Sequence, residues 1–348
     1  APRPPVLGAP RLMRISCIVT DLPRAVDFLM TVVGLTMMRH EEFAQSVEKA
    51  QEVEGARDYE RGDWSRTLLG FEGSDDTSLC VELISIARPV EPSQPRDLTE
   101  ILIFSTSALS RLVDFQVPYL ETPSGVVARV PGAALNVKIL PARSRQLTPH
   151  ISAIIIPTNN MTESLSFFSG ALAMQAAGRE EERQVSLSCG PQGSRILLVK
   201  STRGEKRTSS SLIRLVFGCS APVLRAVAAG AKEQRAKELL PLSCVQGPEA
   251  CNMTMTIFES PEGLEVAAVD KDSVLKMSAL DHSAATRFAA IHESSERPEL
   301  EASSAQTSPL KLLSSQMQEE RGKEEGREEE GEEEEAEEEG KNFMRRKC

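Results

Sequence analysis

The sequence lacks the short motifs of several common enzyme classes. It contains no GxGxxG, no Walker loop, no HExxH and no GxSxG, so it gives no support for nucleotide binding, zinc proteolysis or serine hydrolysis. Histidine is scarce, with four residues in 348. A register shift in a strand could turn His150 inward, but an ordinary histidine between a loop and a strand is the preferred interpretation. Histidine catalysis is therefore not predicted.

Long apolar runs and paired cysteines are also missing. No apolar stretch reaches the ~18 residues of a membrane-spanning helix, so no membrane span is expected. The seven cysteines contain no CxxC and no dense cluster. Most lie in apolar runs, as small buried side chains do in a reducing compartment. These features predict unreactive thiols and a cytoplasmic protein.

Negative charge is concentrated at the C-terminal end. Residues 283–348 carry 18 acidic and 10 basic side chains, whereas residues 1–282 carry 33 and 30. The chain up to residue 282 therefore has no basic excess that would favour nucleic-acid binding. Residues 283–348 are rich in Ser, Glu and Gly, and they hold too few apolar side chains to offset the entropy of ordering. We predict a disordered acidic tail over 283–348.

A long internal repeat is the strongest positive feature. RLMRISCIVTDLPRAVDFLMTVVGLTMMR is echoed by SAIIIPTNNMTESLSFFSGALAMQAAGR. Each copy has an apolar run, a polar turn with a cap-forming Asp21 or Asn160, and then a helical pattern. Asp21 aligns with Asn160, and Phe28 with Phe167, without a gap. A duplicated unit at this separation indicates a repeated architecture.

Hydrophobic periodicity divides the chain into four similar units. The first reads as a strand, a helix that begins near Pro23, and three further strands. The later units begin with apolar strands at 101–105, 151–156 and 212–217, each followed by a helical pattern. The four units account for the chain up to about Asp270. This order predicts an α+β fold made of four βαβββ units.

Paired βαβββ units with the segment VTDLPRAVDFLMTVVGL resemble the vicinal oxygen chelate superfamily, which includes glyoxalase I and the extradiol dioxygenases. The likeness continues in RHEEF, CVEL and SPEGLEVAAVD. The resemblance implies two glyoxalase-like domains, at 11–142 and 148–272. It also implies that the strands form cups around a divalent metal, held by His and Glu side chains on the first and fourth strands of the contributing units.

The residues aligned with those ligand positions differ from the family pattern. If the units pair as in two-domain glyoxalases, one cavity presents Arg14, Glu82, Arg214 and Glu265. The other cavity presents Glu100, Lys138, Leu198 and either Ala153 or a residue next to it.

Neither set is a credible metal site. Arginine has no acceptor atom and repels a divalent cation at close range, so we predict no metal and no other cofactor. Two interpretations of the first set remain open. In one, the four residues form a cluster of salt bridges. In the other, Arg14 and Arg214 bind a carboxylate or phosphate, while Glu82 and Glu265 hold the guanidinium groups in place.

Three functions are compatible with these residues. The first is a glyoxalase-like protein with a degenerate metal site that binds a small anionic or glutathione-like ligand, or a protein partner. The second is a lactoylglutathione lyase, in which zinc or nickel polarises the hemithioacetal oxygens and Glu82 or Glu265 moves the proton. The third is a scaffold that recruits basic partners through the acidic tail.

Overall fold

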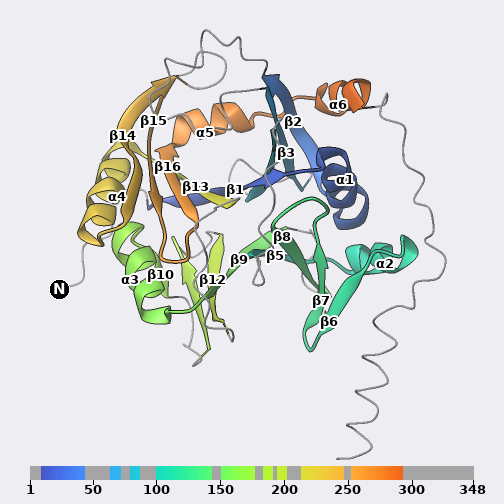
Figure 1. Cartoon of the computed structure of the whole chain (residues 1–348), viewed down its shortest axis with the longest axis horizontal. Coiled ribbons are helices and arrows are strands. Elements are labelled where there is room, and N and C mark those ends of the chain that lie inside the picture. The colour runs from blue at the N-terminus through green and yellow to red at the C-terminus, as the bar shows by residue number, and fades with distance from the viewer. Residues whose placement is uncertain are drawn as a thin grey trace, which may run out of the picture. The chain divides into compact units, whose positions relative to one another are not determined.

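The chain folds into two sheets with helices packed against them. In the residues described below, the strands form two eight-stranded sheets, so the predicted α+β fold class is confirmed (Figure 1). The computed structural model describes residues 9–43, 63–71, 79–86, 99–142, 150–176, 183–190, 194–201, 213–246 and 252–292.

The first sheet combines strands of the first and the fourth repeat unit. β1 and β13 pair antiparallel at its centre, so the two units meet in the middle of the sheet. Its strand order is β14 (Lys237–Gln246), β15 (Asn252–Glu259), β16 (Glu265–Asp270), β13 (Ile213–Cys219), β1 (Arg11–Val19), β4 (Cys80–Ile86), β3 (Trp64–Gly70) and β2 (Thr36–Phe43).

The second sheet combines the two middle units in the same way. β9 and β5 pair antiparallel at its centre. Its strand order is β10 (Gln175–Ala176), β11 (Gln184–Ser188), β12 (Arg195–Lys200), β9 (Ile151–Thr158), β5 (Thr99–Phe104), β8 (Leu135–Leu140), β7 (Gly125–Arg129) and β6 (Tyr119–Thr122).

In each of the four units, the first strand pairs in parallel with the fourth. The predicted division into four βαβββ units therefore agrees with the sheet topology. Each sheet takes strands from both of the predicted domains, so the sequence boundaries 11–142 and 148–272 stay predictions.

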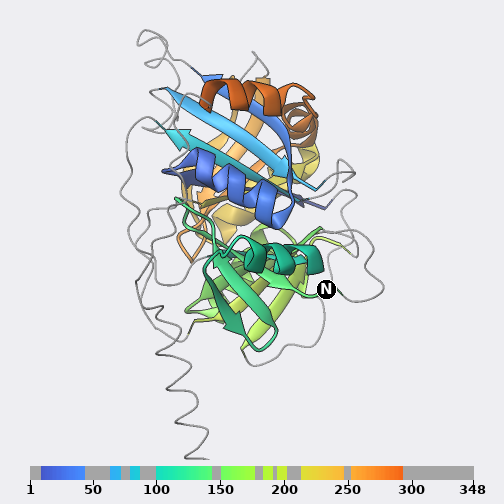
Figure 2. The ribbon, with the colours of Figure 1, turned by 90° about the vertical axis from the view of Figure 1, so that its right-hand side faces the viewer.

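One large apolar core joins both sheets to the helices of the four units. In Figure 2, the helical segment made of α1 (Leu22–Asp27) and η1 (Phe28–Val33) lies beside α2 (Thr106–Asp114). Arg111 on α2 donates to the carbonyl oxygens of Val32 at 2.9 Å and Val33 at 3.2 Å, both in η1. No helix in the described part of the chain is long and apolar enough to cross a membrane. The helices are α1 (Leu22–Asp27), the π-helix η1 (Phe28–Val33), α2 (Thr106–Asp114), α3 (Met161–Ala171), α4 (Ala221–Glu233), α5 (Lys271–Ser278) and α6 (Ala284–His292).

The repeated polar turn caps the first helix of each half, as predicted. The side chain of Asp21 accepts a hydrogen bond from the backbone N–H of Arg24, and the side chain of Asn160 accepts one from the N–H of Glu163, both at 3.2 Å. Such caps satisfy backbone donors that the first helical turn leaves unpaired. Gly34 ends the first helical segment at φ +90°, a conformation that favours glycine.

Helix α5 covers the face of the first sheet that the large core leaves open. Along β1, Ile15 and Cys17 face the large core, so Arg14 and Ser16 face the other way. Val274 of α5 is fully buried on that second face, in a small apolar cluster that includes Val216 of β13. In Figure 1, α5 lies inside the curve of the sheet, between β16 and β3. We call the covered side the cup face.

The C-terminal end of the described chain differs from the sequence prediction. The disordered tail was predicted to begin at residue 283, but α6 occupies 284–292. Asp281 N–H donates to the carbonyl oxygen of Met38, and Arg287 donates to that of His40, both at 2.8 Å. These bonds satisfy the exposed edge strand β2, whose carbonyls would otherwise lack protein partners. Residues 293–348 lie outside the described residues.

Candidate functional site

Four side chains form a line across the cup face. In the strand register, Glu82 on β4 lies beside Ser16 on β1, Ser16 lies beside Arg214 on β13, and Arg214 lies beside Glu265 on β16. We call Glu82, Ser16, Arg214 and Glu265 the charged row. Ser16, rather than Arg14, stands at the first-strand place opposite Glu82. Arg14 lies two residues earlier on the same face.

Both glutamates of the charged row are paired with arginines. Nη1 of Arg14 lies 2.9 Å from Oε1 of Glu82, and these side chains are only 4% and 9% exposed. Nε of Arg214 donates to Oε2 of Glu265 at 3.0 Å. Ser16 donates to the second carboxylate oxygen of Glu82. The structure therefore brings the four predicted residues together as two ion pairs.

Arg14 also ties the sheet to the end of α5. Its Nη2 donates to the carbonyl oxygen of Val274 at 2.8 Å. Nε and Nη2 donate to Oγ of Ser278 at 3.2 and 2.6 Å. All three guanidinium nitrogens are therefore engaged within the chain. A cation is also favourably placed near the C-terminal end of a helix, where carbonyl groups are unpaired.

A second group of charges lies beside the charged row. Nη1 of Arg66 on β3 is 4.0 Å from Oε1 of Glu82, and its Nε donates to Oε2 of Glu41 at 2.8 Å. The other oxygen of Glu41 accepts a hydrogen bond from Nε of Arg39 at 2.8 Å. Arg66 also contacts the sulfur of Met277 on α5 at 3.7 Å. The arginines therefore bridge the carboxylates and α5.

The arginines keep the carboxylates ionised. Burial alone would raise the pKa of Glu82, but the charges of Arg14 and Arg66 and the hydrogen bond from Ser16 outweigh it, so its pKa lies below the usual value. Burial of Glu41 is likewise outweighed by Arg66 and Arg39, and its pKa is lowered. A general base that works near neutral pH needs a pKa raised toward 7. Glu82 is shifted in the opposite direction.

Glu41→Gln should lower the free energy of unfolding at neutral pH and make that free energy less dependent on pH in acid. The lowered pKa of Glu41 means that its ionisation stabilises the fold above the unfolded-state pKa of about 4.3, and that this contribution is lost as the pH falls through the folded-state pKa. We expect a loss of about 1–3 kcal/mol at pH 7 and a shallower decline between about pH 5 and 3. Urea unfolding at several pH values measures both.

The matched control for this prediction is Glu121→Gln. Glu121 is exposed on β6, so its replacement should change the free energy of unfolding by less than about 0.5 kcal/mol. Equal acid sensitivity in the wild type and Glu41→Gln would show that the Glu41 ion pairs do not contribute.

The second sheet brings together only part of its predicted set. Glu100 and Lys138 interact electrostatically, and burial of Glu100 outweighs that attraction and raises its pKa. Leu198 belongs to the large apolar core together with Ile154, so it does not share a face with Ala153. The prediction for Leu198 was wrong because it placed the residue one position out of register on β12. The second sheet therefore holds one charged pair.

The superfamily resemblance implies a divalent metal, but the residues of the charged row do not fit one. A metal site needs several lone pairs that converge on one point. Oε1 of Glu82 accepts from Arg14, and Oε2 accepts from Ser16. Arg214 stands where a neutral imidazole or a carboxylate would be required, and its cation is 3.0 Å from Glu265. We therefore assign no metal-dependent reaction to this face.

Two buried thiols of the first sheet are also poor nucleophiles. Burial raises the pKa of Cys17 to about 12 and that of Cys80 to about 11. Since the thiolate is the reactive form, both side chains are inert at neutral pH. For these two residues the result agrees with the sequence-based prediction of unreactive thiols, whereas Cys244 is exposed.

Comparisons with known proteins place this fold among the glyoxalases. A model of the family described as glyoxalase domain-containing protein 4-like, C-terminal domain, matches residues 160–277. The chain is 24% identical over 259 residues to the mouse (Mus musculus) glyoxalase domain-containing protein 4. The aligned region covers 74% of this chain and 84% of the mouse protein. It is 21% identical over 267 residues to glyoxalase 1 of Caenorhabditis elegans, and this aligned region covers 76% of this chain and 90% of the C. elegans protein.

Among solved structures, glyoxalase I from Zea mays aligns with a TM-score of 0.60 at 15% identity, covering 79% of this chain and 97% of that one. At this identity the likeness concerns the fold alone. The paired βαβββ units, the sequence relatives and the structural match agree, and they support a glyoxalase-like protein with the fold of the vicinal oxygen chelate superfamily.

Proposed function

We propose that this protein does not catalyse a metal-dependent glyoxalase reaction and instead binds a small anionic ligand on the cup face. The observation that carries the proposal is the pairing of Glu82 with Arg14 and of Glu265 with Arg214. Carboxylates in such pairs are not available to a divalent cation. The ligand positions of the fold are thereby converted from a cation site into an arginine-rich one.

The charges named on this face favour an anion over a cation. Four arginines on this face, at positions 14, 39, 66 and 214, outnumber its three glutamates, at positions 41, 82 and 265. Guanidinium groups bind carboxylates and phosphates through paired hydrogen bonds. A ligand with one or two carboxylates, such as glutathione or a glutathione conjugate, therefore has the chemistry that this face would recognise.

Helix α5 determines how a ligand could enter. Arg14 is engaged by Val274 and Ser278, so an anion reaches it only if α5 moves. Arg214 is more accessible, because its side chain is 16% exposed. We therefore assign the first contact with the ligand to Arg214, and contact with Arg14 to a state in which α5 is displaced.

Lactoylglutathione lyase activity is the main alternative, because several similar proteins are named glyoxalases. That reaction needs a metal and a carboxylate base of suitable pKa. The ion pairs along the charged row are unfavourable for a metal, and the lowered pKa of Glu82 is unfavourable for a general base. We therefore rank ligand binding above lyase activity.

Thermal unfolding with added glutathione tests the proposal. Glutathione should raise the midpoint of the wild-type protein, since a ligand that binds only the folded state stabilises it. Arg214→Met should weaken this response by at least about tenfold in ligand concentration, because a lost charged hydrogen bond of about 1.5–3 kcal/mol corresponds to that factor or more. Arg225→Met, on the exposed side of α4, is the matched control. Equal responses in both variants would contradict the assignment of Arg214.

We further propose a cytoplasmic location and partner binding through the acidic segment after residue 292. None of the five described cysteines forms a disulfide, which suits a reducing compartment. The acidic segment has a charge that would attract basic partners.

A further inference from the structure

A cluster of metal-ligating side chains lies on the far side of the edge strand β2 from the cup face. Neighbouring residues of a strand point to opposite faces. Arg39 and Glu41 bond to each other on the cup side, so His40 and Glu42 point away from it. The ring of His40 packs against Phe288 of α6, with centroids 5.0 Å apart. The cluster is therefore separate from the charged row.

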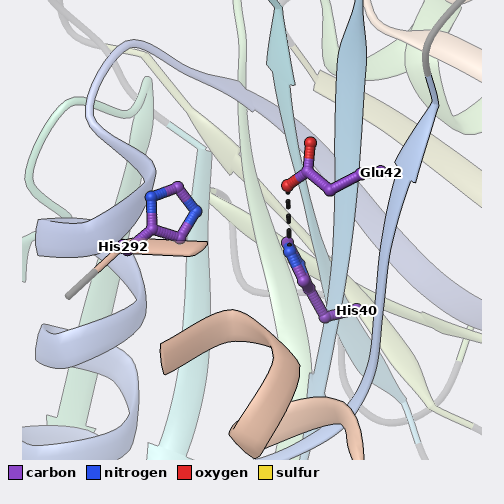
Figure 3. A group of neighbouring side chains, drawn as sticks. All are labelled: His40, Glu42 and His292. Carbon is purple, nitrogen blue, oxygen red and sulfur yellow. Dashed lines mark ion pairs between the residues drawn. The ribbon is translucent and has the colours of Figure 1, made fainter. Parts of the chain in front are cut away.

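His292, the last residue of α6, completes this cluster. One ring nitrogen of His40, one carboxylate oxygen of Glu42 and one ring nitrogen of His292 all lie within 4.8 Å of one another (Figure 3). Ligands at 2.0–2.2 Å from a tetrahedral zinc ion stand about 3.3 Å apart. The observed spacing therefore needs only a small shift of His292, which lies at the end of a helix.

The immediate surroundings of His40 direct its Nε2 toward Glu42. Nδ1 of His40 is 2.9 Å from Oγ1 of Thr67, which is fully buried. A histidine that ligates a metal commonly holds its second ring nitrogen in such a hydrogen bond. Nε2 lies 3.0 Å from Oε1 of Glu42, yet it has no partner in hydrogen-bonding geometry. A buried nitrogen of this kind is satisfied by a cation that it ligates together with the neighbouring carboxylate.

The open volume beside the cluster fits a cation as well. The nearby positive charge of Arg287 is compensated by its ion pair with Asp281. A pocket of about 410 Å³ opens beside His40 and Glu42, so an ion has a path to the site.

We propose that His40, Glu42 and His292 form a zinc site that clamps α6 onto β2. Two imidazoles and one carboxylate are a donor set that zinc binds with one position left for water. The ligands come from strand β2 and from a helix about 250 residues later in the chain. Bound zinc would therefore hold the C-terminal end of the described chain against the first sheet, at a site independent of the proposed anion site.

Zinc titration of the metal-stripped full-length protein tests this proposal. We expect one tightly bound zinc ion in the wild type and binding at least about tenfold weaker in His292→Ala and in Glu42→Gln, because each change removes a ligand. Both side chains are partly or fully exposed, so the variants should fold. His282→Ala, which removes an exposed histidine just before α6, should bind zinc like the wild type.

Cobalt and hydrogen exchange distinguish this site from binding elsewhere. Co²⁺ should give the visible bands of a tetrahedral nitrogen and oxygen site without a thiolate charge-transfer band. Zinc should slow amide exchange in residues 284–292 of the wild type and of His282→Ala, but not of His292→Ala. Equal zinc affinity in His292→Ala and His282→Ala, or a thiolate band, would overturn the proposal. The glutathione response should be the same in His292→Ala and the wild type, so failure of one proposal leaves the other testable.

Discussion

Arg14→Met should lower the free energy of unfolding by about 3–5 kcal/mol, because removing one partner of a buried ion pair leaves an uncompensated charge. Glu82 would lose its closest cation, at 2.9 Å. The carbonyl oxygen of Val274 and the hydroxyl of Ser278 would also lose their donor. Urea unfolding followed by the fluorescence of Trp64, the single tryptophan, reports the change within the first sheet.

An exposed ion pair provides the control for this prediction. Arg24 lies 3.5 Å from Asp21, and these side chains are 63% and 38% exposed. Such surface pairs contribute about 0–1 kcal/mol, so Arg24→Met should have a small effect. If Arg14→Met destabilised the protein no more than Arg24→Met, the Arg14–Glu82 pair would not be the buried link between sheet and helix described above.

Val274→Asp should release α5 from the cup face. Val274 is fully buried in an apolar cluster with Val216 and Val269. A carboxylate at this position would lose its hydration and would be surrounded by apolar side chains. Burying such a group costs several kcal/mol, so we expect a loss of at least about 3 kcal/mol in the docking of α5. Faster amide exchange at residues 271–278 and increased binding of an apolar dye would report the release.

Leu280→Asp is the matched control, since Leu280 follows α5 and is 54% exposed. It should leave exchange in α5 unchanged. If Val274→Asp unfolded the whole chain in one step, α5 would be an integral part of the fold and could not move aside for a ligand. That outcome would contradict the proposed route to Arg14.

Local sequence signals predicted the repeated core of the fold. The caps at Asp21 and Asn160 and the apolar first strand of each unit were readable because backbone chemistry determines them within a few residues. Edge strands were harder to read. β14 (Lys237–Gln246) contains Pro241 and two irregularities in its pairing, so it has no clean alternation of apolar and polar residues.

The charged row was predicted only in part, because its geometry depends on long-range packing. The positions of Glu82, Arg214 and Glu265 followed from the repeat, but Ser16 carries no charge and gave no signal within an apolar strand. Helices α5 and α6 were missed for a related reason. Their apolar faces are short, with Val274 and Met277 in one helix and Ala284 in the other, and their burial comes from the sheet rather than from a strong helical pattern.

The most direct test of the central claim is steady-state conversion of the methylglyoxal–glutathione hemithioacetal by the purified full-length chain. The assay is run with Zn²⁺, Ni²⁺, Co²⁺ or Mn²⁺ added in turn, for the wild type and for Glu82→Gln. Because the carboxylates of the charged row are paired with arginines, the rate should equal the uncatalysed rate in every case. Metal-dependent turnover that is lost in Glu82→Gln would contradict the proposed non-catalytic function and would favour lactoylglutathione lyase activity instead.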